Sequence, residues 1–213
     1  MKKILLLCFT TGALIILAGC DHTEALSHHD QGYALYQQKQ YDKAVQEYKE
    51  AIRLYPNYLD AYLSLGNLYE DRGQFADAEA AYKSALEIKK DHIMANMNLG
   101  NAYRKQGKLK EAAKQIEYAV ELKPGECWIQ DNLGNIYEQM GQMEKAIQRY
   151  QIAVQCDDND PEFQTDLANA YLKIGDRLKA LTHYRRLLNI VGGLEKYQRE
   201  ETFARDMIAK MEH

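Results

Sequence analysis

The sequence predicts an all-α fold built from five repeated helix pairs and a final helix. Three observations support this: small residues recur every 34 positions, apolar residues inside each period follow helical spacing, and glycine or proline interrupts the helices. The chain has 213 residues, 46% of them hydrophobic, and three prolines, so it is expected to fold rather than remain disordered.

The 34-residue period rests on four sets of equivalent positions. Glycine, or alanine in the last copy, occupies the first set: Gly32, Gly66, Gly100, Gly134 and Ala168. Alanine occupies the second set: Ala44, Ala78, Ala112, Ala146 and Ala180. The third set is Ala51, Ala85, Ala119, Ala153 and Leu187, and the fourth is Tyr48, Tyr82, Ile116, Tyr150 and Tyr184. The copies therefore span residues 25–58, 59–92, 93–126, 127–160 and 161–194.

Each copy reads as two helices separated by a short turn. In the second copy, small and apolar residues follow helical spacing on both sides of Gly73: Ala61, Leu65, Leu68 and Tyr69 before it, and Phe75, Ala78, Tyr82, Ala85 and Ile88 after it. Pro56 and Pro124 end two of the second helices, because proline cannot continue a helical turn. Small residues are expected where the two helices cross closely.

This pattern resembles the tetratricopeptide repeat (TPR) family over residues 25–194. The resemblance implies a right-handed superhelix in which the first helix of every repeat lines a concave groove. Position n of a copy is called slot n below. The family's frequent tryptophan in slot 4 is replaced by His28, Tyr62, Asn96, Gln130 and Gln164, which predicts looser packing of the later first helices.

Residues 195–213 do not fit a sixth copy and are expected to form a capping helix. Apolar residues at helical spacing lie among charged ones there: Tyr197, Ala204, Met207, Ile208 and Met211. A repeat array needs such a helix, with a polar outer face, to cover its last repeat. A tail that binds a partner is the alternative.

The first nineteen residues have the layout of a secretory signal peptide. Lys2 and Lys3 precede an apolar run from Ile4 to Leu17, which is short for a membrane-spanning helix. The end of the segment, Leu17-Ala18-Gly19-Cys20, resembles the bacterial lipobox. The resemblance implies cleavage before Cys20, acylation of that cysteine with palmitate-type chains, and a short tether over residues 20–24. The alternative is a plain cleaved signal in which Cys20 is incidental.

A lipidated Cys20 would place the protein in the bacterial cell envelope, facing the periplasm. Two or more acyl chains anchor a protein stably on a membrane. Asp21 resembles the signal that retains lipoproteins of enteric-type bacteria on the inner membrane, so it favours the inner over the outer membrane.

Composition and motifs exclude several other classes of function. The net charge is −4 and there is no clustered basic face, so a nucleic-acid partner is not expected. No phosphate loop, nucleophile elbow or pair of metal-ligand signatures occurs, so we expect no enzyme, no cofactor and no metal. His22, His28, His29 and Asp30 are expected in a solvated N-terminal stretch.

Two cysteines remain in the repeats, Cys127 in slot 1 and Cys156 in slot 30 of the fourth copy. The start of a first helix lies near the end of the second helix in an antiparallel pair, and an oxidising envelope permits a disulfide. The alternative is a buried Cys156 in a slot usually filled by Leu or Ile, with Cys127 as a free thiol.

The candidate binding surface is the groove face of the first helices. Asparagine recurs in slots 6 and 9, and its amide can donate to and accept from the main chain of an extended peptide. The candidate residues are Asn67, Asn98, Asn101, Asn132, Asn135 and Asn169.

Apolar groove residues are more individual than the asparagines. Met94 and Trp128 occupy slot 2 and Met97 occupies slot 5, where they are expected to form an exposed apolar patch. Alternatively, Trp128 folds back over slot 4. Slots 2, 5 and 6 contain no Lys or Arg, so an acidic peptide tail is an unsuitable ligand. A neutral or mildly basic, partly apolar peptide fits better.

These expectations combine into a lipid-anchored scaffold that binds a protein segment in its concave groove. The resemblance also allows two narrower roles. One is an assembly factor for a type IV pilus or secretin complex, and the other is an adaptor that recruits cell-wall hydrolases or proteases.

Overall fold

A computed structural model describes residues 22–212. The expected signal peptide, the lipidated Cys20 and Asp21 lie outside these residues. Within them the chain is helical and contains no strand, which confirms the all-α TPR fold. None of the described helices is both long and apolar enough to cross a membrane.

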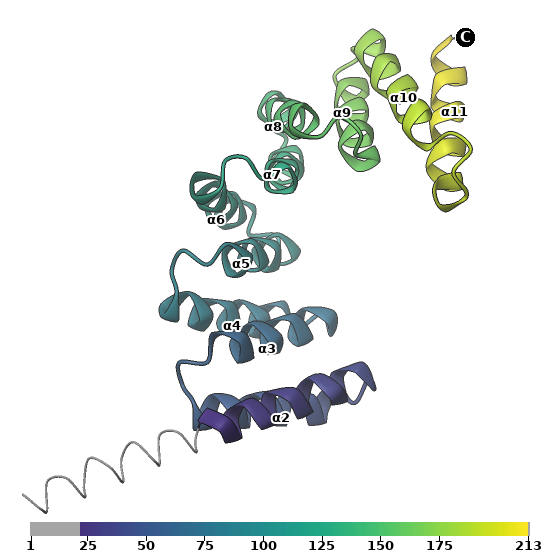
Figure 1. The fold of residues 1–213 in the computed structure, drawn as a ribbon. Helices are drawn as coiled ribbons and strands as arrows, with labels where there is room; N and C mark the ends of the chain where they lie inside the picture. The colour runs from purple at the N-terminus through teal and green to yellow at the C-terminus, as the bar shows by residue number, and fades with distance from the viewer. Residues whose placement is uncertain (1–21, 213) are drawn as a thin grey trace, which may run out of the picture. The chain divides into compact units, whose positions relative to one another are not determined.

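Ten helices follow an N-terminal one over residues 22–37, and Figure 1 shows their succession along the described part of the chain. They are α2 (Tyr41–Leu54), α3 (Leu59–Asp71), α4 (Phe75–Ile88), α5 (Ile93–Lys105), α6 (Leu109–Leu122), α7 (Cys127–Gln139), α8 (Met143–Cys156), α9 (Pro161–Lys173), α10 (Arg177–Val191) and α11 (Gln198–Glu212). A 3-10 turn, η1 (Glu195–Tyr197), precedes α11. The chain divides into two compact units, which meet in sequence between Gln106 and Gly107 and are described separately below.

The turn inside each helix pair requires a left-handed backbone at slot 15. Gly73, Gly107, Gly141 and Gly175 hold this position with φ between 70° and 81°. Lys39 holds it in the first copy with φ of 59°. Glycine adopts this conformation without a steric cost, which is why it interrupts the helical pattern at this spacing.

A buried tyrosine in slot 24 fills the space between the two helices of a repeat. Tyr48, Tyr82, Tyr150 and Tyr184 are at most 2% exposed. A Cβ atom added at Gly32 would lie 2.7 Å from the ring of Tyr48, and one added at Gly134 would lie 2.6 Å from the ring of Tyr150. The recurring glycine in slot 8 therefore gives the tyrosine ring its place against the first helix.

The polar residues in slot 4 are buried, and the prediction of loose packing there is wrong. Asn96, Gln130 and Gln164 are 1%, 3% and 2% exposed. Each amide nitrogen donates to a backbone carbonyl six residues earlier, at 2.9 Å to Lys90 O, 3.1 Å to Pro124 O and 2.9 Å to Asp158 O, respectively. These amides satisfy a backbone carbonyl of the loop that enters each of these repeats.

Two N-terminal histidines pack against neighbouring helices, so the prediction of a solvated stretch is wrong for His28 and His29, whereas His22 and Asp30 are exposed as expected. His28 Nδ1 hydrogen-bonds Glu47 Oε2 at 2.6 Å, and His29 Nε2 hydrogen-bonds Ser64 Oγ at 3.0 Å. Both rings are partly buried, with side-chain exposures of 26% and 18%. The two histidines therefore point to different helices, α2 and α3, and make structural contacts.

Cys127 and Cys156 form a disulfide in the structure, with Cα atoms 5.5 Å apart. It joins the first residue of α7 to the last residue of α8, and Cys156 is exposed rather than buried. A disulfide that closes a loop of this length stabilises a fold by about 3 kcal/mol in the chain-entropy model.

The C-terminal helix α11 packs against α10 of the last repeat (Figure 1). Ala204 is fully buried, and the ring of Phe203 meets that of Tyr184 edge-on with centroids 5.8 Å apart. Arg185 pairs with Glu212 at 2.6 Å, and Gly193 N donates to Glu201 Oε2 at 3.0 Å. These contacts cover the end of the repeat array with a polar outer surface.

We expect Gly134→Ala to destabilise the second unit by about 2 kcal/mol, because the added methyl group forces the buried Tyr150 ring to move. Thermal unfolding followed by circular dichroism measures the change. Gly125→Ala is the matched control, since a Cβ atom at Gly125 meets nothing within 4 Å. Equal losses in the two variants would contradict the proposed role of slot 8.

Candidate functional site

The first helices of neighbouring repeats are linked by amide side chains in the first unit. Tyr82 Oη donates to Asn67 Oδ1 at 2.8 Å and to Glu70 Oε2 at 3.0 Å, and burial raises the pKa of the phenol. Asn98 Nδ2, one repeat further on, also donates to Asn67 Oδ1, at 2.9 Å. Asn67 is exposed, so it carries both a structural bond and a free surface.

The same arrangement recurs in the second unit. Tyr150 Oη donates to Asn135 Oδ1 at 3.0 Å, and Tyr184 Oη donates to Asn169 Oδ1 at 2.5 Å. Asn135 Nδ2 then donates to the next repeat, at 3.2 Å to Asp166 Oδ2. The slot 9 asparagine thus accepts a hydrogen bond from the slot 24 tyrosine of its own repeat, fifteen residues later.

Two other candidate asparagines have different surroundings. Asn101 Oδ1 is buried without a hydrogen-bond partner, and the residue fifteen positions later is Ile116, which has no hydroxyl group. Asn132 Nδ2 donates to Trp128 O at 2.8 Å in its own helix. Asn101 is therefore the slot 9 asparagine whose carbonyl the fold leaves unsatisfied.

The three apolar candidates differ in exposure. Met94 is 49% exposed and available to a ligand. Met97 is 1% exposed, so its expected place in an exposed patch is wrong and it is a core residue. Trp128 is half-buried and its Nε1 donates to Glu126 Oε2 at 3.3 Å, while the buried Gln130 occupies slot 4. Trp128 is thus not needed to close slot 4.

Carboxylates gather on the first helices of the fourth and fifth repeats. Asn135 Nδ2 donates to Asp131 Oδ2 at 3.0 Å as well as to Asp166, so one amide holds two carboxylates. Asp131 is 4% exposed and its Oδ1 has no partner. Burial, reinforced by the charges of Asp166, Glu162 and Asp160, raises the pKa of Asp131 to about 8.

Asp166 is the second perturbed carboxylate of this surface. Burial raises the pKa of Asp166 to about 6, although the hydrogen bond from Asn135 opposes the shift. Lys173, which forms an ion pair with Glu138, also lowers the pKa of Asp166. Two carboxyl groups with raised pKa values on one surface are typical of a functional site, because burying them lowers stability.

The sequence analysis did not single out Asp131. The signal was present, because Asp131 occupies slot 5, where the two preceding copies have Leu63 and Met97. An ionisable residue in a slot that is otherwise apolar indicates a buried charge or a binding role.

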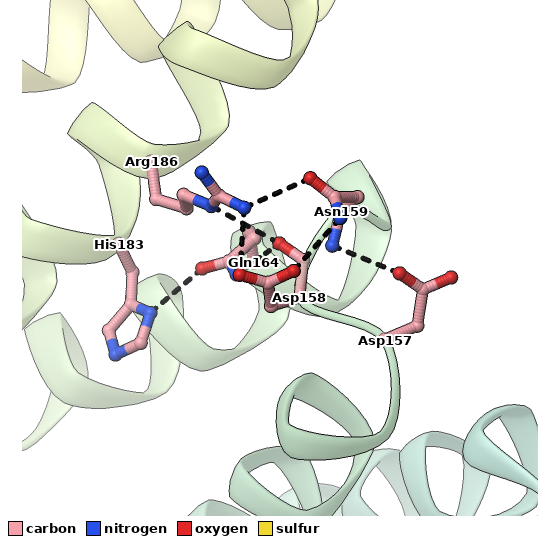
Figure 2. A network of polar contacts seen from close by, with 6 residues as sticks. All are labelled: Asp157, Asp158, Asn159, Gln164, His183 and Arg186. Carbon is pink, nitrogen blue, oxygen red and sulfur yellow. Dashed lines mark hydrogen bonds and ion pairs between the residues drawn. The ribbon is translucent and has the colours of Figure 1, made fainter.

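The α8–α9 loop that leads into this surface is fixed by polar contacts with α10 (Figure 2). Arg186 Nη2 donates to Asp158 Oδ2 at 2.7 Å and to Asn159 Oδ1 at 2.9 Å. Gln164 bridges the loop carbonyl to His183, whose Nδ1 lies 2.8 Å from Gln164 Oε1 and whose pKa is lowered by burial. The loop ends at Asp160, the N-cap of α9, whose side chain accepts a hydrogen bond from Glu162 N.

These helix pairs, with their small, glycine and tyrosine slots, define a repeat protein of the TPR class. Two family models agree: one described as TPR repeat matches residues 32–71 and 134–175, and one described as Tetratricopeptide repeat matches residues 63–126. The chain belongs to the tetratricopeptide repeat family. A comparison with curated proteins finds no match.

Solved TPR structures share this fold. MamA 41-end from Desulfovibrio magneticus RS-1 is 20% identical, with a TM-score of 0.75 over 81% of this chain and 97% of that one. PilF of Pseudomonas aeruginosa is 19% identical, with a TM-score of 0.70 over 90% of both chains. YrrB, described as a TPR protein with an unusual peptide-binding site, is 19% identical, with a TM-score of 0.67 over 85% of this chain and 92% of that one.

We expect stability to fall as the pH rises from about 4 to about 8, because Asp131 retains its proton over this range only in the folded state. Asp131→Asn removes this dependence, so the variant should gain about 1.4 kcal/mol relative to wild type for each pH unit of this range, and almost nothing at pH 4.

Urea unfolding of both proteins across this range measures the effect. Asp206→Asn is the control, since Asp206 lies on the exposed face of α11. If the stability of wild type and of Asp131→Asn changed with pH in the same way, the pH dependence would not come from the Asp131 carboxyl group.

Proposed function

We propose that the protein is a lipid-anchored adaptor of the bacterial cell envelope that binds a protein segment along the groove face of its first helices. It would hold a partner near the membrane and carry out no catalysis itself. The observation that carries the binding role is the surface of linked amides and carboxylates on the first helices of each unit.

The groove face suits an extended segment because its polar groups are positioned before a ligand arrives. Buried tyrosines hold the slot 9 amides, and the amides in turn hold groups of the next repeat. Fixed polar groups bind an extended main chain at a lower entropic cost than mobile ones. Met94, half-exposed beside them, offers apolar contact area.

The membrane role rests on the sequence of the first twenty residues. The basic start, the apolar run and Leu17-Ala18-Gly19-Cys20 together resemble a lipoprotein signal. The periplasm would be an oxidising compartment, which is compatible with the disulfide between Cys127 and Cys156. Asp21 favours anchoring in the inner rather than the outer membrane.

Photo-cross-linking in the native host tests the binding face. A photoreactive phenylalanine in place of Met94 or Glu162, both exposed on first helices, should give a discrete cross-linked species. The same residue in place of Lys114 or Glu144, exposed on second helices, should not. Cross-links formed equally from both sets, or from the second helices alone, would refute groove binding. Mass spectrometry of the captured chain separates pilus or secretin subunits from cell-wall hydrolases and proteases.

Replacement of the lipobox cysteine tests the anchor. The Cys20→Ser protein should keep its signal segment uncleaved and should carry no lipid. Gel mobility measures the cleavage, and labelling with a fatty-acid analogue measures the lipid. Cys8→Ser, within the segment that is removed, is the matched control and should behave as wild type. Unchanged labelling of Cys20→Ser would refute the lipoprotein proposal, and recovery of wild type in the outer membrane would refute the assignment from Asp21.

A further inference from the structure

An acidic surface lies on the first helices of the fourth and fifth repeats, and its carboxylates differ in depth. Glu162 is exposed, Asp166 is half-buried, and Asp131 is 4% exposed. The amide of Asn135 joins the two deeper carboxylates, at 3.0 and 3.2 Å. This surface, Asp131, Glu162 and Asp166, is called the acidic anchor below.

The buried carboxyl groups of the acidic anchor lack partners that would stabilise their ionised forms. Asp131 Oδ1 is buried and has no hydrogen-bond partner, and Asp131 keeps its proton in the folded state. Lys173 is the cation that acts on Asp166, and it forms its ion pair with Glu138. The unpartnered oxygen of Asp131 and the carboxylates around it both indicate that a cation bound here would favour the ionised form of these groups.

A cavity beside the anchor has room for a side chain. Its volume is 460 Å³, and it is lined by Asp160, Pro161, Glu162, Thr165, Tyr197 and Glu200. Three of these residues are acidic and none is basic. Tyr197 and Glu200 come from η1 and α11, so the C-terminal helix supplies one wall. Glu162 belongs to both the cavity and the anchor.

The geometry favours an organic cation with several N–H donors. The carboxylates come from two helices and are spaced by an amide, so they do not converge on a single point as ligands of a metal ion do. A guanidinium group has a planar set of donors that can reach two carboxylates at once, and an ammonium group is a compact alternative.

We propose that the fourth and fifth repeats bind an arginine or lysine side chain of the partner segment, with Glu162 and Asp166 in contact with the cation and Asp131 behind them. This rests on the proposed groove function, since the cation belongs to a segment on the same face. A bound cation would also favour the ionised form of the buried Asp131, which keeps its proton in the free protein. The partner is therefore a protein segment with a basic residue at a fixed position.

Selection of displayed random peptides against the full chain in detergent micelles tests this proposal. Selected peptides should share one basic position. A synthetic peptide with arginine there should bind about tenfold more tightly than its citrulline counterpart, which keeps the shape and removes the charge. In Asp166→Asn and Glu162→Gln this difference between the two peptides should disappear. Glu121→Gln, an exposed carboxylate on α6, is the matched control and should preserve it.

The outcomes separate this proposal from the groove function. Equal affinities of the arginine and citrulline peptides would overturn the acidic anchor and leave peptide binding intact. If Glu121→Gln also removed the difference in affinity between the two peptides, the difference would depend on overall charge alone. That result would overturn the acidic anchor as well. Two results would contradict the proposed groove binding itself. One is that no peptide is selected, and the other is that the selected peptides bind with unchanged affinity when Met94 and Glu162 carry bulky labels. Circular dichroism of each variant checks that it is folded.

Discussion

The contact between a buried tyrosine and a glycine of the preceding helix determines how each repeat is built. The tyrosine ring packs against a position that has no Cβ atom. Slot 8 provides this position in three repeats, where a Cβ atom added to the glycine would lie too close to the ring. Its hydroxyl group, buried by the same contact, must find an acceptor, and the adjacent slot 9 asparagine is that acceptor. Close helix packing and the polar side chains of slot 9 therefore have a common origin.

This coupling changes how the slot 9 asparagines are understood. Asn67 and Asn135 each accept a hydrogen bond from a tyrosine, and each contacts a side chain of the next repeat. Removing such a residue would take away one of the two acceptors of a buried tyrosine hydroxyl and a link to the next repeat, so a loss of binding could not be separated from a loss of stability. Exposed positions such as Met94 and Glu162 probe the surface without touching that bond. The acidic anchor, by contrast, has no counterpart in the repeat pattern.

Periodicity predicted most of the fold because its causes are local. Helical spacing, the turn glycines and the small crossing residues all act within one repeat, and the slots follow directly from the sequence. The sequence pattern did not predict the contacts of individual side chains, whether with a nearby loop or with residues 15 to 35 positions away. The amide of Gln164 looked like a missing tryptophan, yet it bonds the loop carbonyl of Asp158. Met97 looked like a surface residue because its slot faces the groove in the family, but it is buried. Asp131 stood out from its slot only by its charge.

The hydrogen bonds of the repeats follow a pattern of fixed offsets, and this affects how such a chain can change length. A tyrosine contacts an asparagine fifteen positions earlier, and side chains of successive first helices meet across 31 or 35 positions. If 34 consecutive residues are gained or lost, at whatever position in a repeat, every remaining side chain still lies next to a residue that occupies the same slot as its former neighbour. Recombination between copies would therefore shorten or extend the array while every side chain still faces the same slot, whereas a one-residue insertion within a helix would shift several contacts at once.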